Sequence, residues 1–170
     1  MKTLAIFWWS RELPINKKAE LNAELEIFFT LIKSRVDRVI YWWGKDWVML
    51  DIYNKSIEHW VEIIWYSLEK YKKPDDYWEN IYFPNDDERL QQFYDNSESA
   101  VTFPWSIWTI REVLQYNEFI KRYNKDKLIY ISPLFHAFYE LIRLLDVDNM
   151  IALEDQKQII KVDNFEIIRI

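Results

Sequence analysis

The sequence predicts an α+β fold, in which a mixed or antiparallel sheet is covered by about four helices and ends in a C-terminal β-meander. Apolar residues recur at helical spacing in several long segments, whereas short apolar runs separated by polar turns fill the end of the chain. With 170 residues, half of them hydrophobic, the chain has enough apolar material for one core. No repeat or linker divides it, so we expect residues 1–170 to form a single domain.

The first third of the chain predicts a strand, a helix and a hairpin. Residues 3–9 are a compact, aromatic-rich run typical of a buried strand. A helix of about five turns follows, with Glu24 among the charged residues of its polar side. Its apolar stripe comprises Leu21, Leu25, Phe28, Ile32 and Val36. Residues 38–43 and 47–53 flank the turn-like residues 44–46 and predict a hairpin, unless the helix bends into the first of these segments.

The middle of the chain predicts two further helices. An apolar stripe over residues 57–71 predicts a helix that Asn54 or Ser56 caps and Pro74 ends. Beyond an acidic stretch with a helical turn or two at residues 87–94, residues 106–123 predict a helix. A capping box of Thr109 with Glu112 supports that helix.

The last third predicts one more strand and helix before the meander. Residues 127–131 are typical of a strand, and Ser132 with Pro133 predicts the start of a helix. The residues expected to face inward from that helix are Leu134, Phe138, Leu141 and Leu145. Residues 150–153, 157–162 and 165–170 then predict three strands joined by short polar turns, the antiparallel meander of the fold prediction.

Composition excludes several classes of function. The only glycine is Gly44, so a glycine-rich loop for a phosphate or a dinucleotide is not expected. There is no cysteine, which excludes disulfides, thiolate metal sites and thiol catalysis and suits a reducing cytoplasm. No uncharged run reaches the roughly 20 residues needed to span a bilayer, and an N-terminal signal peptide is not expected. A net charge of −6 argues against nucleic-acid binding.

The most unusual segment is the acidic stretch, residues 74–98, which holds eight carboxylates and one base, Arg89. All of the net negative charge of the protein lies there, and aromatic rings are interleaved with it, which is atypical of a disordered acidic tail. We therefore predict an ordered, acidic and aromatic surface that binds a positively charged partner. The predicted contact residues are Asp75, Asp76, Tyr77, Trp78, Glu79, Tyr82, Phe83, Asp86, Asp87 and Glu88. Ordinary solubilising charge is the alternative explanation.

No catalytic residue, metal site or cofactor is predicted. His59 with Glu62 supplies at most two metal ligands, and His136 with Glu140 and Arg143 is typical of an exposed salt-bridge ladder. Carboxylates beside aromatic rings, together with ten tryptophans, leave a carbohydrate-binding module or small glycosidase as an alternative function.

About the first 45 residues resemble the opening of bacterial immunity proteins that accompany polymorphic toxins with restriction-endonuclease-like nuclease domains. The resemblance consists of the aromatic strand, Trp8 or Trp9 shortly before Arg11, the long helix, and Trp42 and Trp43 just after it. It implies a cytoplasmic, non-catalytic antitoxin whose partner is a cognate protein toxin. We therefore predict an immunity protein that neutralises a toxin through the acidic surface, with a phage-encoded adaptor or structural protein as a further alternative.

Overall fold

Seven strands among the described residues form one sheet in the computed structural model, which describes residues 1–8, 14–42, 48–72, 80–103, 107–123, 126–147 and 157–169. The strands are β1 (Thr3–Phe7), β2 (Arg38–Trp42), β3 (Glu62–Leu68), β4 (Asn80–Phe83), β5 (Ser99–Thr102), β6 (Ile129–Ile131) and β7 (Ile159–Lys161). The helices are α1 (Ile15–Ile32), α2 (Val48–Glu58), α3 (Asp86–Asp95), α4 (Ile107–Tyr123) and α5 (His136–Val147). Short 3₁₀ turns are η1 (Glu69–Tyr71), η2 (Pro133–Phe135) and η4 (Phe165–Ile167).

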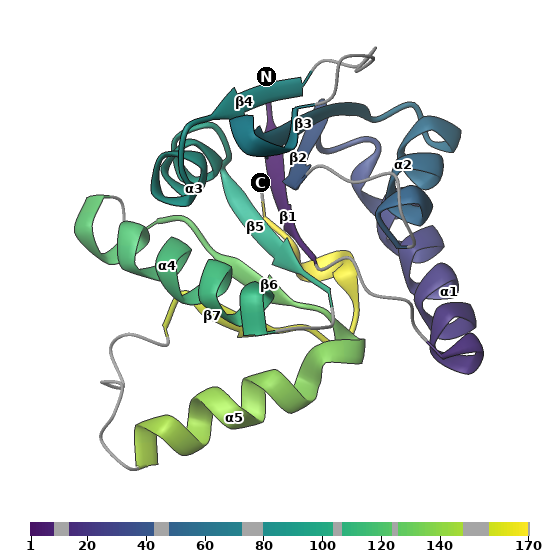
Figure 1. The fold of residues 1–170 in the computed structure, drawn as a ribbon. Helices are drawn as coiled ribbons and strands as arrows, with labels where there is room; N and C mark the ends of the chain where they lie inside the picture. The colour runs from purple at the N-terminus through teal and green to yellow at the C-terminus, as the bar shows by residue number, and fades with distance from the viewer. Residues whose placement is uncertain are drawn as a thin grey trace.

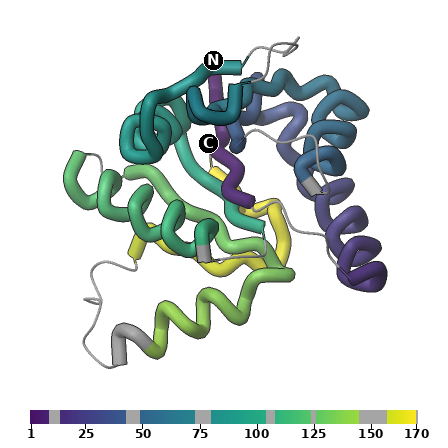
Figure 2. Tube along the Cα trace, viewed as in Figure 1, coloured from purple at the N-terminus to yellow at the C-terminus, as the bar shows by residue number. Residues whose placement is uncertain are grey.

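Every strand pairing in this sheet is parallel, in the order β4-β3-β2-β1-β5-β6-β7. The chain winds outward from β1 to one edge of the sheet, returns to β5, and winds to the other edge (Figures 1 and 2). The predicted α+β fold with a mixed or antiparallel sheet is therefore wrong, because the protein is a doubly wound α/β fold. The central strands explain why, since β1 and β5 are buried at every residue, as strands covered on both faces must be.

Helices cover both faces of the sheet and divide the core into two clusters. Helices α1 and α2 and the segment around η4 pack on one face, where Phe28 contacts Phe103 and Phe165 with ring centroids 5.1 and 5.0 Å apart. Helices α3, α4 and α5 pack on the other, where Phe93 lies 5.5 Å from Phe7. Figure 1 shows these two groups of helices on opposite sides of the strands. No helix in the described part of the chain is long and apolar enough to cross a membrane.

Two predicted elements near residues 38–71 are wrong. The hairpin is absent, because residues 38–42 form the parallel strand β2 and the following segment is helix α2, whose Met49, Ile52 and Ser56 are buried at helical spacing. The predicted helix over residues 57–71 is instead strand β3, with Ser56 inside α2 and its hydroxyl bonded to the Ile52 carbonyl. The β-branched and aromatic residues of β3 suit a strand buried on both faces, which an apolar periodicity cannot distinguish from a helix.

The predicted C-terminal meander is also wrong. Strand β7 pairs in parallel with β6, and Phe165 belongs to the 3₁₀ turn η4 rather than to a strand. The strand predicted at residues 150–153 lies outside the described residues. In α5, Phe138 faces inward as expected, but Leu141 is exposed and Ile142 occupies the inner position instead.

Helix α2 ends in a Schellman motif that places Trp60 in the left-handed region, with φ of 59°. The amide of Val61 donates to the Ser56 carbonyl and that of Trp60 to the Ile57 carbonyl, the two hydrogen bonds of this motif. Left-handed backbone costs a residue with a Cβ atom about 1–2 kcal/mol, and the Trp60 side chain is 95% exposed, so little packing offsets this cost.

We therefore expect Trp60→Gly to raise the free energy of unfolding by about 0.5–1 kcal/mol, after the entropic penalty of glycine is subtracted. Chemical denaturation measures the free energy of unfolding of the variant and of the unmodified protein. Trp60→Ala is the matched control, because it removes the same side chain but keeps the Cβ atom. An equal gain from alanine would show that the exposed ring, rather than the backbone, is responsible.

Candidate functional site

The candidate functional site lies at the carboxyl edge of the sheet, around β1 and β5. Strand order reverses between these two strands, and in open α/β sheets ligands bind beside the carboxyl ends of the strands at such a reversal. Helices α3 and α4 both begin at this edge, because each follows the carboxyl end of a strand. Side chains from β2, α3 and α4 meet there.

Arg89 is the centre of the site and is only 2% exposed. Its Nη2 lies 3.1 Å from Asp86 Oδ1 and 2.9 Å from Glu112 Oε1, and its guanidinium carbon lies 3.6 Å from the centre of the Trp42 ring. Arg111 lies 3.7 Å from the second oxygen of Asp86. A buried guanidinium is thus held between two carboxylates and an aromatic face, the arrangement that arginine, more than lysine, can satisfy.

Nη1 of Arg89 has no hydrogen-bond partner among the described residues, and neither has the buried hydroxyl of Thr109, one turn before Glu112 on α4. Thr109 was predicted to cap the helix together with Glu112, which is wrong, because α4 begins at Ile107 and the Glu112 carboxylate bonds to Arg89. Burial raises the pKa of Glu112, and the neighbouring Arg89 charge opposes that shift. The site therefore pairs an ionised arginine with a strongly desolvated carboxyl group.

A second buried carboxyl group, Glu24 of α1, lies at the same edge on the other face of the sheet. The residues that directly follow β1, β5 and β6 are Trp8, Phe103 and Ser132. They lie side by side at this edge, because Phe7 pairs with Thr102 and Thr102 with Ile131. Glu24 is 8% exposed, and its Oε1 has no hydrogen-bond partner in the part of the chain that the structure describes. Burial raises its pKa to about 7, although interactions with the Ser132 hydroxyl and the Leu134 backbone lower it in part.

The sequence placed Glu24 on the polar side of its helix, and this is wrong. Glu24 is three residues after Leu21 and four before Phe28, so the helical period itself puts it in the apolar stripe. The sequence also contains a sign that Arg89 is unusual, since Arg89 is the one base in a segment with eight carboxylates. A lone base in such a segment is a candidate for a buried ion pair, and its partner Glu112 lies 23 residues further on.

The predicted contact residues are only partly brought together. Asp75, Asp76, Tyr77, Trp78 and Glu79 lie outside the described residues. Tyr82 and Phe83 belong to β4, where the Lys72 ammonium lies 5.3 Å from the Tyr82 ring and Phe83 packs 5.1 Å from Tyr66.

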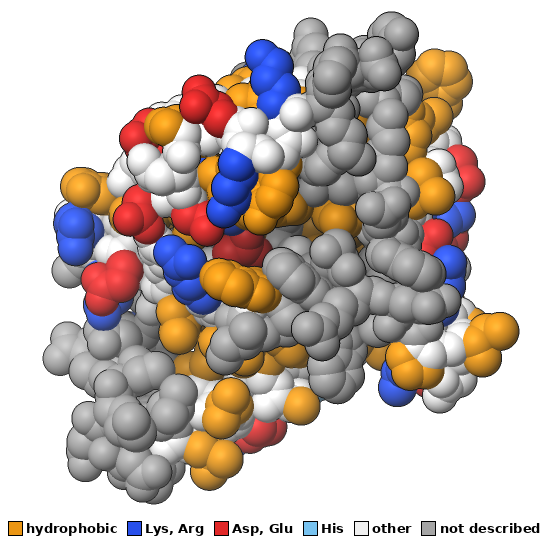
Figure 3. All heavy atoms as spheres, in the orientation of Figure 1, with side chains coloured by type: hydrophobic (Ala, Val, Ile, Leu, Met, Phe, Trp, Pro, Cys, Tyr) orange, Lys and Arg blue, Asp and Glu red, His pale blue; other side chains and the backbone are white. Residues whose placement is uncertain are grey.

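Asp86, Asp87 and Glu88 form the first turn of α3, where negative charge favours the helix N-terminus. Asp86 is turned inward to Arg89, Asp87 is exposed and pairs loosely with Arg111, and Glu88 contacts the capping residue Asn85. Over α3 and α4, Figure 3 shows acidic and basic side chains interspersed rather than a continuous acidic face.

Both histidines have partners within the fold. His59 Nε2 lies 3.1 Å from Glu26 Oε1, and its ring stacks on Phe29. His136 donates to the Val162 carbonyl at 2.8 Å, while Glu140 pairs with Arg143 as expected. Within the ranges that the structure describes, no group of three or more His, Cys, Asp or Glu residues could hold a metal ion.

The fold and the site together define a doubly wound α/β protein with a charged and aromatic cluster at the carboxyl edge of a parallel sheet. No known family model matches the chain, and no curated protein matches it either. The fold is similar to that of the molybdenum cofactor binding protein from Rippkaea orientalis, with a TM-score of 0.67 and 11% identity over 97% of this chain and 91% of that one. The molybdenum cofactor carrier protein from Chlamydomonas reinhardtii has a TM-score of 0.62 and 10% identity, with 97% and 92% covered.

A third similar structure is the structural genomics target TM1055, with a TM-score of 0.61 and 14% identity over 98% of this chain and 95% of that one. These likenesses correct the predicted function. Two of the similar proteins are known for a small-molecule cofactor, so the prediction of an immunity protein that neutralises a cognate protein toxin is wrong. No comparison bears on the resemblance over the first 45 residues, which stays a prediction.

Proposed function

We propose that this protein binds a small anionic organic molecule of the cofactor class at the carboxyl edge of its sheet, as a binding or carrier protein without catalysis of its own. The observation that carries the proposal is Nη1 of Arg89, a buried and charged donor without a partner among the described residues. Leaving such a donor unpaired costs about 1–3 kcal/mol or more. A ligand oxygen that accepts a hydrogen bond from Nη1 would remove that cost. We also propose that the protein is located in the cytoplasm, because a chain without cysteine suits a reducing compartment.

The residues of the site fit an anionic, ring-bearing cofactor such as the molybdenum cofactor. The Thr109 hydroxyl is a second buried donor for the anion, and the N-terminal turn of α4 adds a favourable field for negative charge. Trp42 offers an aromatic surface beside the guanidinium. The single glycine leaves no loop in which several backbone amides could approach a phosphate, so we expect side chains to make most of the contacts.

Ligand binding should be tested with paired probes that differ only in charge. We expect neopterin monophosphate and AMP to bind about tenfold or more tightly than neopterin and adenosine, because a bond to a buried arginine is charge-assisted. Calorimetry gives the affinities, and sodium molybdate tests the metal oxyanion alone.

Arg89→Lys should weaken binding of the phosphorylated probes by about tenfold, because lysine keeps the charge but loses the planar fork. The matched control is Arg122→Lys, which changes an exposed arginine at the opposite end of α4. The proposal fails if none of the charged probes binds, or if Arg89→Lys binds them as tightly as the unmodified protein does.

A further inference from the structure

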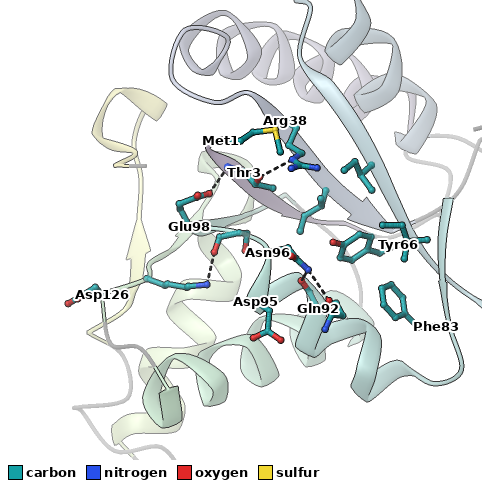
Figure 4. A pocket seen from close by; sticks show the side chains of 15 residues that line it. Met1, Thr3, Arg38, Tyr66, Phe83, Gln92, Asp95, Asn96, Glu98 and Asp126 are labelled. Carbon is teal, nitrogen blue, oxygen red and sulfur yellow. Dashed lines mark hydrogen bonds between the residues drawn. The ribbon is translucent and has the colours of Figure 1, made fainter. Parts of the chain in front are cut away.

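A hollow of about 770 Å³ begins at the edge where β1 and β2 start and extends over the face of the sheet that α3 covers, as far as Phe83, the last residue of β4 (Figure 4). We call it the amino-edge pocket, and its volume lies within the roughly 300–1,000 Å³ of small-molecule sites. The starts of β1 and β2, the strands β3 and β4, and the last turn of α3 enclose it. It shares no residue with the cluster around Arg89, and the proposed function does not use it.

One wall of the amino-edge pocket is apolar. Ile64 and Phe83 line it, and Ile81 is 43% exposed on β4, which is unusual for a large aliphatic side chain on a sheet that is otherwise well covered. Phe83 packs edge-on against Tyr66, whose hydroxyl points into the pocket in Figure 4. This wall fits the apolar part of a ligand.

The other side of the pocket presents two opposite charges, one on each side of Thr3. The Thr3 amide donates to Glu98 Oε2, and Arg38 Nε donates to the Thr3 hydroxyl at 3.2 Å. Arg38 lines the pocket and forms no ion pair with any described residue. Glu98 Oε1 likewise has no hydrogen bond from the described parts of the chain. Figure 4 shows Arg38, Thr3 and Glu98 together along this side.

Two other charged side chains around the pocket are already engaged. Lys127 donates to the backbone carbonyls of Tyr94 and Ser97, and Asp95 accepts from Gln91. Helix α3 ends here, and the partial negative charge of a helix C-terminus disfavours a ligand with net negative charge. A zwitterion avoids that penalty, because its own positive group offsets its carboxylate.

We propose that the amino-edge pocket binds an α-amino acid with an apolar side chain. Its carboxylate pairs with the Arg38 guanidinium, its ammonium group pairs with Glu98, and its side chain lies against the apolar wall. The short bridge through Thr3 brings the two protein charges close enough to meet two groups that share one carbon atom of the ligand. Both pairs are partly exposed, so we expect moderate affinity that falls with added salt.

Phenylalanine and its singly charged analogues test this assignment. In calorimetry, phenylalanine should bind about tenfold more tightly than 3-phenylpropionate, which lacks the ammonium group, and than phenethylamine, which lacks the carboxylate. Arg38→Gln should abolish the preference over phenethylamine, and Glu98→Gln should abolish the preference over 3-phenylpropionate. Arg143→Gln, at an exposed arginine of α5, should change neither preference.

Two further variants distinguish binding at the amino-edge pocket from binding at the Arg89 site, and a loss of binding from a loss of folding. Arg89→Lys should leave phenylalanine binding unchanged, since it alters only the carboxyl edge. Ile81→Glu places a charge at an exposed position of the pocket wall and should weaken phenylalanine binding about tenfold in a folded protein. The proposal is overturned if the three compounds bind equally, if none binds, or if Ile81→Glu has no effect on binding.

Discussion

Replacing Arg89 by methionine should lower the free energy of unfolding by about 3–5 kcal/mol at neutral pH, because it leaves the carboxylate of Glu112 buried without a partner. Both residues are more than 90% buried, and their charged atoms are 2.9 Å apart. The loss should grow as pH rises. In the variant the folded state retains the Glu112 proton to a higher pH than the unfolded state does, so stability falls as pH rises above the ordinary carboxyl pKa.

A double variant distinguishes a broken ion pair from lost packing. Arg89→Met combined with Glu112→Leu replaces the pair by apolar side chains and should recover most of the stability, since buried pairs are often replaceable as a unit. Arg111→Met is the control within the same cluster, and it should cost at most about 1 kcal/mol because Arg111 is half-exposed and its ion pairs are long. If the double variant is no more stable than Arg89→Met alone, packing of the arginine rather than its charge accounts for the loss.

Glu24 should make the protein less stable as pH rises from about 4.5 to about 7. An unfolded glutamate loses its proton near pH 4.5, whereas burial holds the folded pKa of Glu24 at about 7. Between these values the folded state binds the additional proton, so the free energy of unfolding falls as pH rises. The free energy of unfolding falls by roughly 3 kcal/mol in total. This follows from the difference between the folded and unfolded pKa values of Glu24, since each tenfold difference in proton affinity is worth about 1.4 kcal/mol.

Glu24→Gln should remove this dependence and make the protein more stable than the unmodified chain at pH 8, with little difference near pH 4.5. Denaturation at several pH values measures the effect. Glu20→Gln, an exposed residue of the same helix, is the matched control and should have almost no effect on the pH profile. A constant difference between Glu24→Gln and the unmodified protein at all pH values would contradict the assignment of the shift to Glu24.

Several elements could be predicted because their signals are local. The stripe of Leu21, Leu25 and Phe28 predicts α1, and residues 106–123 predict α4, because a helix is stabilised by contacts within a few turns. The buried runs of β1 and β6 also lie where the sequence places them. Strand β3 was predicted as a helix, because an apolar segment buried on all sides has no period that identifies its type.

The candidate site could be predicted only in fragments. Asp86 was included as an exposed contact residue, whereas the structure turns it inward to Arg89. Glu112 was assigned to a helix cap, although its partner is a residue of another helix. Each of these residues has an ordinary local explanation, so its function becomes visible only when distant segments are placed beside one another.

The available chemistry follows from the amino-acid sequence alone, which has one glycine, no cysteine, an excess of aromatic rings, and helices whose apolar stripes require a core. The parallel direction of the seven described strands is visible only in the folded protein, because strand direction depends on crossover connections between distant segments rather than on local propensity. The parallel order brings the carboxyl ends of the strands to one edge, together with Arg89, Trp42 and Glu112. It leaves Arg38 and Glu98 at the opposite edge, on either side of Thr3.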